Sequence, residues 1–115
     1  MNLSFDELRA ANTARCEQVY HPLNDWSVTD WACAMAGEAG EACNVAKKIR
    51  RRETGTRAPN DPNTLEECHA LLAAELADTV IYCDLLAARL DINLGNAIRK
   101  KFNRTSERMK SDVRL

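Results

Sequence analysis

The chain has 115 residues and a formal net charge of −1 at pH 7, with 45% hydrophobic and only 5% aromatic residues. A chain of this length can bury one modest core, so we expect a single domain over residues 1–115. The small net charge argues against a globally basic nucleic-acid binder. Because aromatic residues, glycines and prolines are few, we expect an all-α fold rather than a sheet.

Five cysteines are spread along the chain without a Cys-x-x-Cys pair: Cys16, Cys33, Cys43, Cys68 and Cys83. Most fall among apolar residues of expected helices, where a thiol behaves as a small buried hydrophobe, and this usage favours a reducing compartment. No signal-peptide pattern opens the chain, and no apolar run approaches the roughly 20 residues of a membrane span. We therefore expect a cytoplasmic protein that does not enter membranes.

A capping box marks the start of the first expected helix. Ser4 and Glu7 are spaced so that each side chain can accept a hydrogen bond from the other residue's backbone N–H. Hydrophobic spacing carries this helix to about Tyr20, and Pro22 ends it soon afterwards. The side chains expected to turn inward are Phe5, Leu8, Ala11, Val19 and Cys16.

A second capping box is formed by Ser27 and Asp30, which have the same spacing. The helix that it opens is expected to run from about Val28 to about Arg52. Residues 53–63 follow and concentrate helix breakers, with one glycine and two prolines. We interpret this segment as an exposed, mobile loop that connects two helices of one domain.

The third and fourth helices complete the predicted fold. Thr64 and Glu67 repeat the capping-box spacing and open a helix that Leu and Ala carry to about Leu90. After a short turn, Asn93 is placed as the N-cap of a last helix. Its expected inner face comprises Leu94, Ile98, Phe102 and Met109. Four helices with short connections predict a four-helix bundle-type fold.

Two acidic pairs stand inside apolar helix stripes, Glu38 with Glu41 and Glu75 with Asp78. Each pair is spaced i, i+3, so both carboxylates project from nearly the same helix face. The apolar row around the first pair comprises Trp31, Met35, Ala42, Val45 and Ile49. Because unpaired charges are costly where helices face one another, these carboxylates need a cation. Carboxylate oxygens suit Mg²⁺, with Mn²⁺ as a substitute.

Basic residues supply the second half of a site. They cluster at Lys47, Lys48, Arg50, Arg51 and Arg52, and again at Lys100, Lys101, Arg104 and Arg108. On the second helix Glu41, Asn44 and Lys48 share a face. A metal beside ammonium and guanidinium groups is typical of phosphate handling. Cations at a helix C-terminus are also ordinary complements to the helix dipole, so the arginines of this run remain open to either interpretation.

Three blocks carry a family resemblance: WACAMAGEAGEACNVAKK at 31–48, ELADTVIY at 75–82 and KFNRTSER at 101–108. In this order they resemble the MazG-like nucleotide pyrophosphohydrolases of the all-α NTP pyrophosphatase superfamily. The resemblance implies a helical bundle that oligomerises as a homodimer or homotetramer. It also implies a Mg²⁺-dependent hydrolase that converts nucleoside triphosphates to monophosphate and pyrophosphate.

The resemblance also assigns roles by position. The implied metal ligands are Glu38, Glu41, Glu75 and Asp78, and Glu38 or Glu41 would accept the proton of the attacking water. The implied substrate contacts are Lys48, Tyr82, Lys101, Asn103 and Arg108. Asn44 is a further candidate because it shares a helix face with Glu41 and Lys48. The residues His21, Trp26 and Trp31 have side chains that can contact a base, but a helix-end or core role suits them better.

Two other functions compete with the hydrolase. The first is a di-iron carboxylate bundle, for which Glu66 and His69 supply one Glu-x-x-His. That architecture needs a second such motif, and Gln18 stands where a Glu would have to precede His21. The other alternative is a non-enzymatic helical adaptor whose Lys47–Arg52 run binds nucleic acid or an acidic partner. It leaves the embedded acids unexplained, so we expect no nucleic-acid partner.

Overall fold

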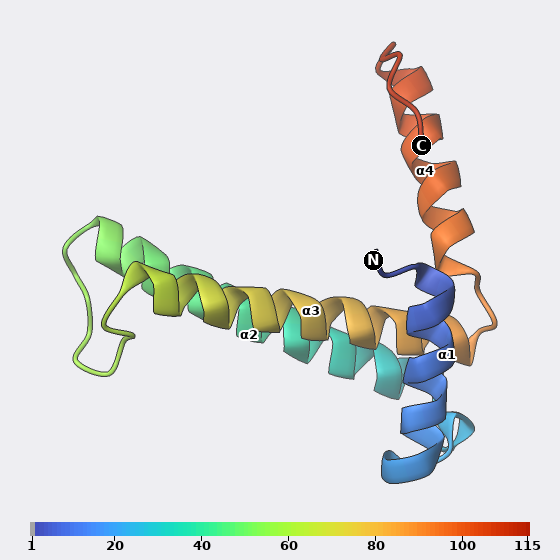
Figure 1. The fold of residues 1–115 in the computed structure, drawn as a ribbon, viewed down its shortest axis with the longest axis horizontal. Coiled ribbons are helices and arrows are strands. Elements are labelled where there is room, and N and C mark those ends of the chain that lie inside the picture. Colours follow the sequence, from blue (N-terminus) through green and yellow to red (C-terminus); the bar gives the residue numbers. More distant parts are fainter. Residues whose placement is uncertain (1) are drawn as a thin grey trace. The chain divides into compact units, whose positions relative to one another are not determined.

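The structure is a computed structural model that describes residues 2–115, and these residues form helices joined by turns and loops (Figure 1). The elements are α1 (Phe5–Arg15), a π-helical turn η1 (Cys16–Tyr20), a 3₁₀ turn η2 (Leu23–Asp25), α2 (Val28–Glu53), α3 (Leu65–Arg89) and α4 (Leu94–Arg108). The all-α prediction is confirmed. Over residues 2–115, no helix combines the length and apolar character that crossing a bilayer requires.

The described residues group into two compact units. The first contains the residues up to Trp26 together with Asp84–Leu115, and the second is Ser27–Cys83. Helix α3 therefore contributes to both units. The single domain and the four-helix bundle stay predictions.

Helices α1 and α2 begin at the predicted capping boxes. Ser4 Oγ accepts from Glu7 N at 3.1 Å, while Glu7 Oε2 accepts from Ser4 N at 2.9 Å. The corresponding distances for Ser27 and Asp30 are 3.1 and 2.9 Å. These bonds satisfy backbone donors that have no partner inside the helix, which fixes both starting points.

The N-termini of α3 and α4 are also capped by side chains. Thr64 Oγ1 accepts from Glu67 N at 3.1 Å, but the Glu67 carboxylate accepts from Asn63 N at 2.9 Å instead of closing the box on Thr64. Asn93 Oδ1 accepts from Asn96 N at 2.9 Å, as its predicted N-cap role requires. The predicted starts of all four α-helices are therefore confirmed.

A buried polar cluster organises the first unit. The Asp84 side chain is 1% exposed and accepts from Arg9 Nε at 3.0 Å and from Asn12 Nδ2 at 3.1 Å. Arg9 also donates to the Ile92 carbonyl at 2.8 Å. A buried carboxylate is tolerated only when it is paired and hydrogen-bonded, and these contacts tie α1 to the end of α3.

The predicted inner face of the first helix is confirmed only in part. Cys16 is buried as expected, but Val19 is 61% exposed and Phe5 39%, and the buried Asn12 was not predicted. Leu8, Asn12 and Cys16 follow one another at i, i+4 spacing and define the observed inner line. The π-helical turn from Cys16 to Tyr20 has more residues per turn, so the α-helical spacing used in the prediction fails there.

The second unit is a hairpin in which α2 and α3 lie side by side and antiparallel (Figure 1). The buried positions Trp31, Ala42 and Val45 on α2 match the predicted apolar row. Cys68 of α3 is buried as well. The two helices thus pack through the row that also contains Glu38, which carries this carboxylate into the helix interface.

The connection between α2 and α3 is ordered around a buried ion pair. Arg51 donates to both carboxylate oxygens of Asp61, at 2.8 and 2.6 Å. Asp61 is only 6% exposed, and its Oδ2 also accepts from Ala58 N at 3.1 Å. The expectation of an exposed segment at 53–63 holds for most of its residues, with the buried Asp61 as the exception, and its mobility stays a prediction.

Helix α4 leaves its predicted inner face open. Ile98 is 38% exposed, Phe102 41% and Met109 71%, so these side chains are not covered within the chain. At its N-terminal end α4 approaches α1, where a Cβ on Gly95 would lie 3.4 Å from Phe5 Cβ. The amphipathic pattern was recognised correctly, but the assumption that the same chain buries it was wrong.

Candidate functional site

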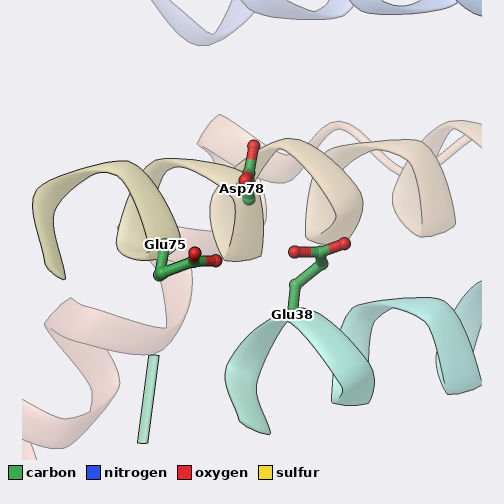
Figure 2. A group of neighbouring side chains, drawn as sticks. All are labelled: Glu38, Glu75 and Asp78. Carbon is green, nitrogen blue, oxygen red and sulfur yellow. The ribbon is translucent and has the colours of Figure 1, made fainter. Parts of the chain in front are cut away.

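Three predicted carboxylates come together between α2 and α3. Glu38 projects from α2 toward Glu75 and Asp78 of α3 (Figure 2), and one carboxylate oxygen of each lies within 4.8 Å of the others. Glu38 and Glu75 are partly buried. The i, i+3 spacing puts the two α3 residues on one face, and the antiparallel pairing of the helices sets Glu38 opposite them. We call these three residues the carboxylate triad.

The triad is electrostatically unfavourable by itself. Burial, followed by the neighbouring charges of Asp78, Glu41 and Glu75, raises the pKa of Glu38. A nearby cation would reverse this effect by favouring the ionised form. Oxygen-only donors on two facing helices fit a hard divalent cation such as Mg²⁺ or Mn²⁺.

The fourth predicted ligand, Glu41, stands apart from the triad. It is exposed, one turn beyond Glu38 on α2, and the group of close carboxylates does not include it. Its charge still contributes to the raised pKa of Glu38, so it belongs to the same electrostatic environment. This arrangement leaves its carboxylate open to water.

The arginines of the basic run on α2 already have partners within the hairpin. Arg50 pairs with Glu53 at 2.9 Å, and Arg51 holds Asp61. Arg52 Nη2 donates to the Pro62 carbonyl at 2.8 Å. Because these guanidinium groups are used inside the hairpin, they support loop structure better than the binding of a nucleic acid or acidic partner.

Asn44 and Lys48 lie on the same side of α2 as Glu41, as the spacing predicts. Asn44 is exposed, whereas Lys48 is partly buried and close enough to Asp61 to help lower its pKa. No hydrogen bond or ion pair of Lys48 occurs within residues 2–115. Unlike the three arginines of this run, Lys48 therefore keeps its ammonium group available to a ligand.

The aromatic residues near the triad are mainly packed. Trp31 is 2% exposed, and its ring centroid lies 6.4 Å from that of Tyr82. The core interpretation of Trp31 is thus confirmed. In the first unit, His21 and Trp26 lie with ring centroids 4.6 Å apart, and the Trp26 carbonyl accepts from Arg89 Nε at 2.8 Å.

The three predicted phosphate contacts of α4 belong to the first unit. Lys101 and Arg108 are exposed. Asn103 has partners already, since its Oδ1 accepts from Leu115 N at 2.9 Å and its Nδ2 donates to the Leu115 carbonyl at 3.4 Å. Their placement beside the triad stays a prediction.

The di-iron alternative gains no support from the ligand set. His69 is exposed on α3, and the triad consists of carboxylates alone. Glu67, beside the Glu-x-x-His motif, accepts a bond from Asn63 N at the start of α3. The histidine ligands that such a centre needs are therefore not assembled among the described residues.

Comparison with known proteins adds one relative. The chain is 32% identical over 74 residues to the "Gene 37 protein" of Mycobacterium phage L5. The match covers 64% of this chain and 59% of the phage protein, so the chain spans well under two thirds of that relative's length. No protein-family model matches the chain.

Proposed function

We propose that this protein is a Mg²⁺-dependent nucleoside triphosphate pyrophosphohydrolase of the MazG-like type. It converts a (d)NTP and water to a (d)NMP and pyrophosphate. The observation that carries the proposal is the carboxylate triad, with Glu38 facing Glu75 and Asp78 across two helices. The order of the three sequence blocks supports the same function.

The triad residues hold the metal in this proposal. When held by these residues, Mg²⁺ or Mn²⁺ would supply charge neutralisation for the triphosphate oxygens and would make a coordinated water more acidic. Glu38, Glu75 and Asp78 supply oxygen donors, and their mutual repulsion is relieved when the cation binds. Glu41, which is exposed and outside the triad, is the proton acceptor rather than a fourth direct ligand.

The proposed reaction needs one proton acceptor, and Glu41 serves as that acceptor. Water oxygen forms a bond to the α-phosphorus, and the bond from that phosphorus to the bridging oxygen breaks. Pyrophosphate leaves with the bridging oxygen, and Glu41 takes the water proton. Lys48 stabilises the negative charge of the phosphates, together with Lys101, Arg108, Asn44, Asn103 and Tyr82 as further substrate contacts.

We also propose that the protein works as a homodimer or homotetramer. Leu76 and Val80, one turn apart on α3, are 53% and 46% exposed, and the open stripe of α4 adds Phe102 and Met109. Exposed apolar surface of this kind marks interfaces. A second copy would bury these faces and complete a helical bundle.

Turnover tests the proposed function. The purified protein is incubated with Mg²⁺ and a panel of nucleoside triphosphates, and monophosphate and pyrophosphate are measured. We expect equal amounts of the two products and none after chelation of the metal. If every triphosphate remains intact with Mg²⁺ and with Mn²⁺, the proposed function is wrong.

A further inference from the structure

A groove of about 460 Å³ opens at the loop end of the α2–α3 hairpin. It lies wholly within the second unit. Helix α2, the connection at 54–64 and helix α3 all contribute to its lining, which comprises Lys48, Asn60, Pro62, Glu67, Ala70 and Leu71. None of the roles assigned so far uses this groove except through Lys48.

The rim of the groove is fixed by arginines. Asn60 and Pro62 flank Asp61, which both nitrogens of the Arg51 fork hold at 2.8 and 2.6 Å. The Pro62 carbonyl accepts from Arg52 Nη2 at 2.8 Å and from Arg57 Nε at 3.2 Å. These bonds hold the rim in place before a ligand arrives, which lowers the ordering cost of binding.

The groove lies on the triad's side of the hairpin. Leu71 precedes Glu75 by one helical turn and shares its face, and Lys48 lies two turns beyond Glu41. In the opposite direction along the hairpin, Trp31 is buried and packed near Tyr82. The face of α3 that carries Glu75 and Asp78 therefore continues to Leu71 in the lining of the groove.

The chemistry of the lining favours a nucleoside over further phosphates. Pro62, Ala70 and Leu71 provide apolar walls, and the Asn60 amide has no hydrogen-bond partner within the described chain. Glu67 adds a carboxylate to the lining, and Lys48, which also lines the groove, serves the phosphates in the proposed function. A polyphosphate end would meet the Glu67 carboxylate, whereas a flat heterocycle can use the apolar walls and pair its polar edge with an amide.

We infer that this groove takes the base and sugar of the substrate, with Asn60 hydrogen-bonding the base edge and Leu71 contacting its face. The inference rests on the proposed function, because the triphosphate must be anchored at the triad. Asn60 and Leu71 are then specificity-determining residues, and the connection at 54–64 is the segment that sets base preference.

Steady-state kinetics with Mg²⁺ test this assignment on two substrate types. One is a panel of nucleoside triphosphates, and the other is methyl triphosphate, which keeps the ester but lacks base and sugar. For Asn60→Ala and Leu71→Ala we expect KM for nucleoside triphosphates to rise about three- to tenfold, as for loss of one neutral contact. The constants for methyl triphosphate should not change.

Matched controls lie outside the groove. Leu65 is 42% exposed on the same helix and Leu71 is 43% exposed, so Leu65→Ala removes a comparable surface. Asn24→Ala removes an exposed amide elsewhere. Wild-type KM values for Asn60→Ala and Leu71→Ala, or equal changes with methyl triphosphate, would overturn the inference.

Calorimetric binding of Mg²⁺-nucleoside triphosphate separates this inference from the proposed function. If the protein shows no turnover but Asn60→Ala and Leu71→Ala selectively weaken nucleotide binding, the groove assignment is supported and the hydrolase function is refuted. If turnover occurs and neither substitution changes it, the hydrolase function is supported and the groove assignment is refuted. Absence of both binding and turnover would refute both.

Discussion

At the scale of single residues, Glu38 and Glu41 have neighbouring positions but different surroundings. Glu38 faces Glu75 and Asp78, and burial with the surrounding negative charge raises its pKa. Glu41, one turn later, is exposed and outside the close group. In the proposed mechanism this difference separates a metal ligand from a proton acceptor, although the sequence motif presents both residues as equivalent.

Replacing these two residues should therefore give different defects. For Glu41→Gln we expect kcat to fall about 100-fold or more, the usual contribution of a positioned base, with Mg²⁺ binding retained. For Glu38→Gln we expect Mg²⁺ binding itself to weaken. Metal titration and kinetics on both variants check this, with Glu66→Gln as the control. Loss of Mg²⁺ binding in Glu41→Gln would place that residue among the ligands instead.

The buried ion pair of the connection predicts an acid-sensitive component of stability. The Arg51 guanidinium and the Ala58 N–H lower the pKa of Asp61 from 3.8 to about 2. Because the folded-state pKa is the lower one, the stabilisation is present above pH 3.8 and is lost as pH falls toward 2. Thermal unfolding between these pH values should show a smaller pH dependence for Asp61→Asn than for the wild type. Identical slopes would count against the ion pair.

The triad was predictable from sequence, but this ion pair was not. Helical periodicity predicts which helix face is occupied by carboxylates spaced i, i+3 inside apolar stripes. Asp61 lies in a segment rich in breakers, and its partner Arg51 stands ten residues earlier with no periodic relation to it. The groove was missed for the same reason, since Asn60 and Pro62 acquire their positions only from that contact.

At the scale of elements, capping residues predicted where the helices begin, but the sequence did not predict where the number of residues per turn changes. The side-chain caps of all four α-helices occur at the residues expected from their spacing. Capping chemistry is local, so a single sequence contains it fully. The π-helical turn after Arg15 is different, because it changes the number of residues per turn without a distinctive residue pattern.

The cap of α2 provides a stability test. Ser27→Ala removes the acceptor for Asp30 N and should lower the free energy of unfolding by about 1 kcal/mol. Denaturant titration measures the change, and Ser27→Asp, which restores an acceptor, should recover most of it. An unchanged midpoint for Ser27→Ala would show that this bond does not contribute to stability.

At the scale of the whole molecule, uncovered apolar surface is the main departure from the sequence expectation. Hydrophobic spacing identified the inner face of α4, yet Phe102 and Met109 are open, as is Leu76 on α3. Periodicity shows that a face needs to be buried, but it does not show whether the same chain or another copy buries it.

Oligomerisation is therefore a direct prediction. We expect light scattering to report a dimer or tetramer for the wild type. Leu76→Glu should favour the monomer, because a charge in an apolar interface is costly. Leu3→Glu is a suitable control, since Leu3 is 73% exposed near the chain start. A monomeric wild type at working concentration would contradict the proposed assembly.

The most direct test of the central claim is hydrolysis of a nucleoside triphosphate in water enriched in oxygen-18, with products analysed by mass spectrometry. Attack at the α-phosphorus predicts one labelled oxygen in the monophosphate and none in the pyrophosphate. Labelled pyrophosphate, label in released orthophosphate, or no products with Mg²⁺ would contradict the account.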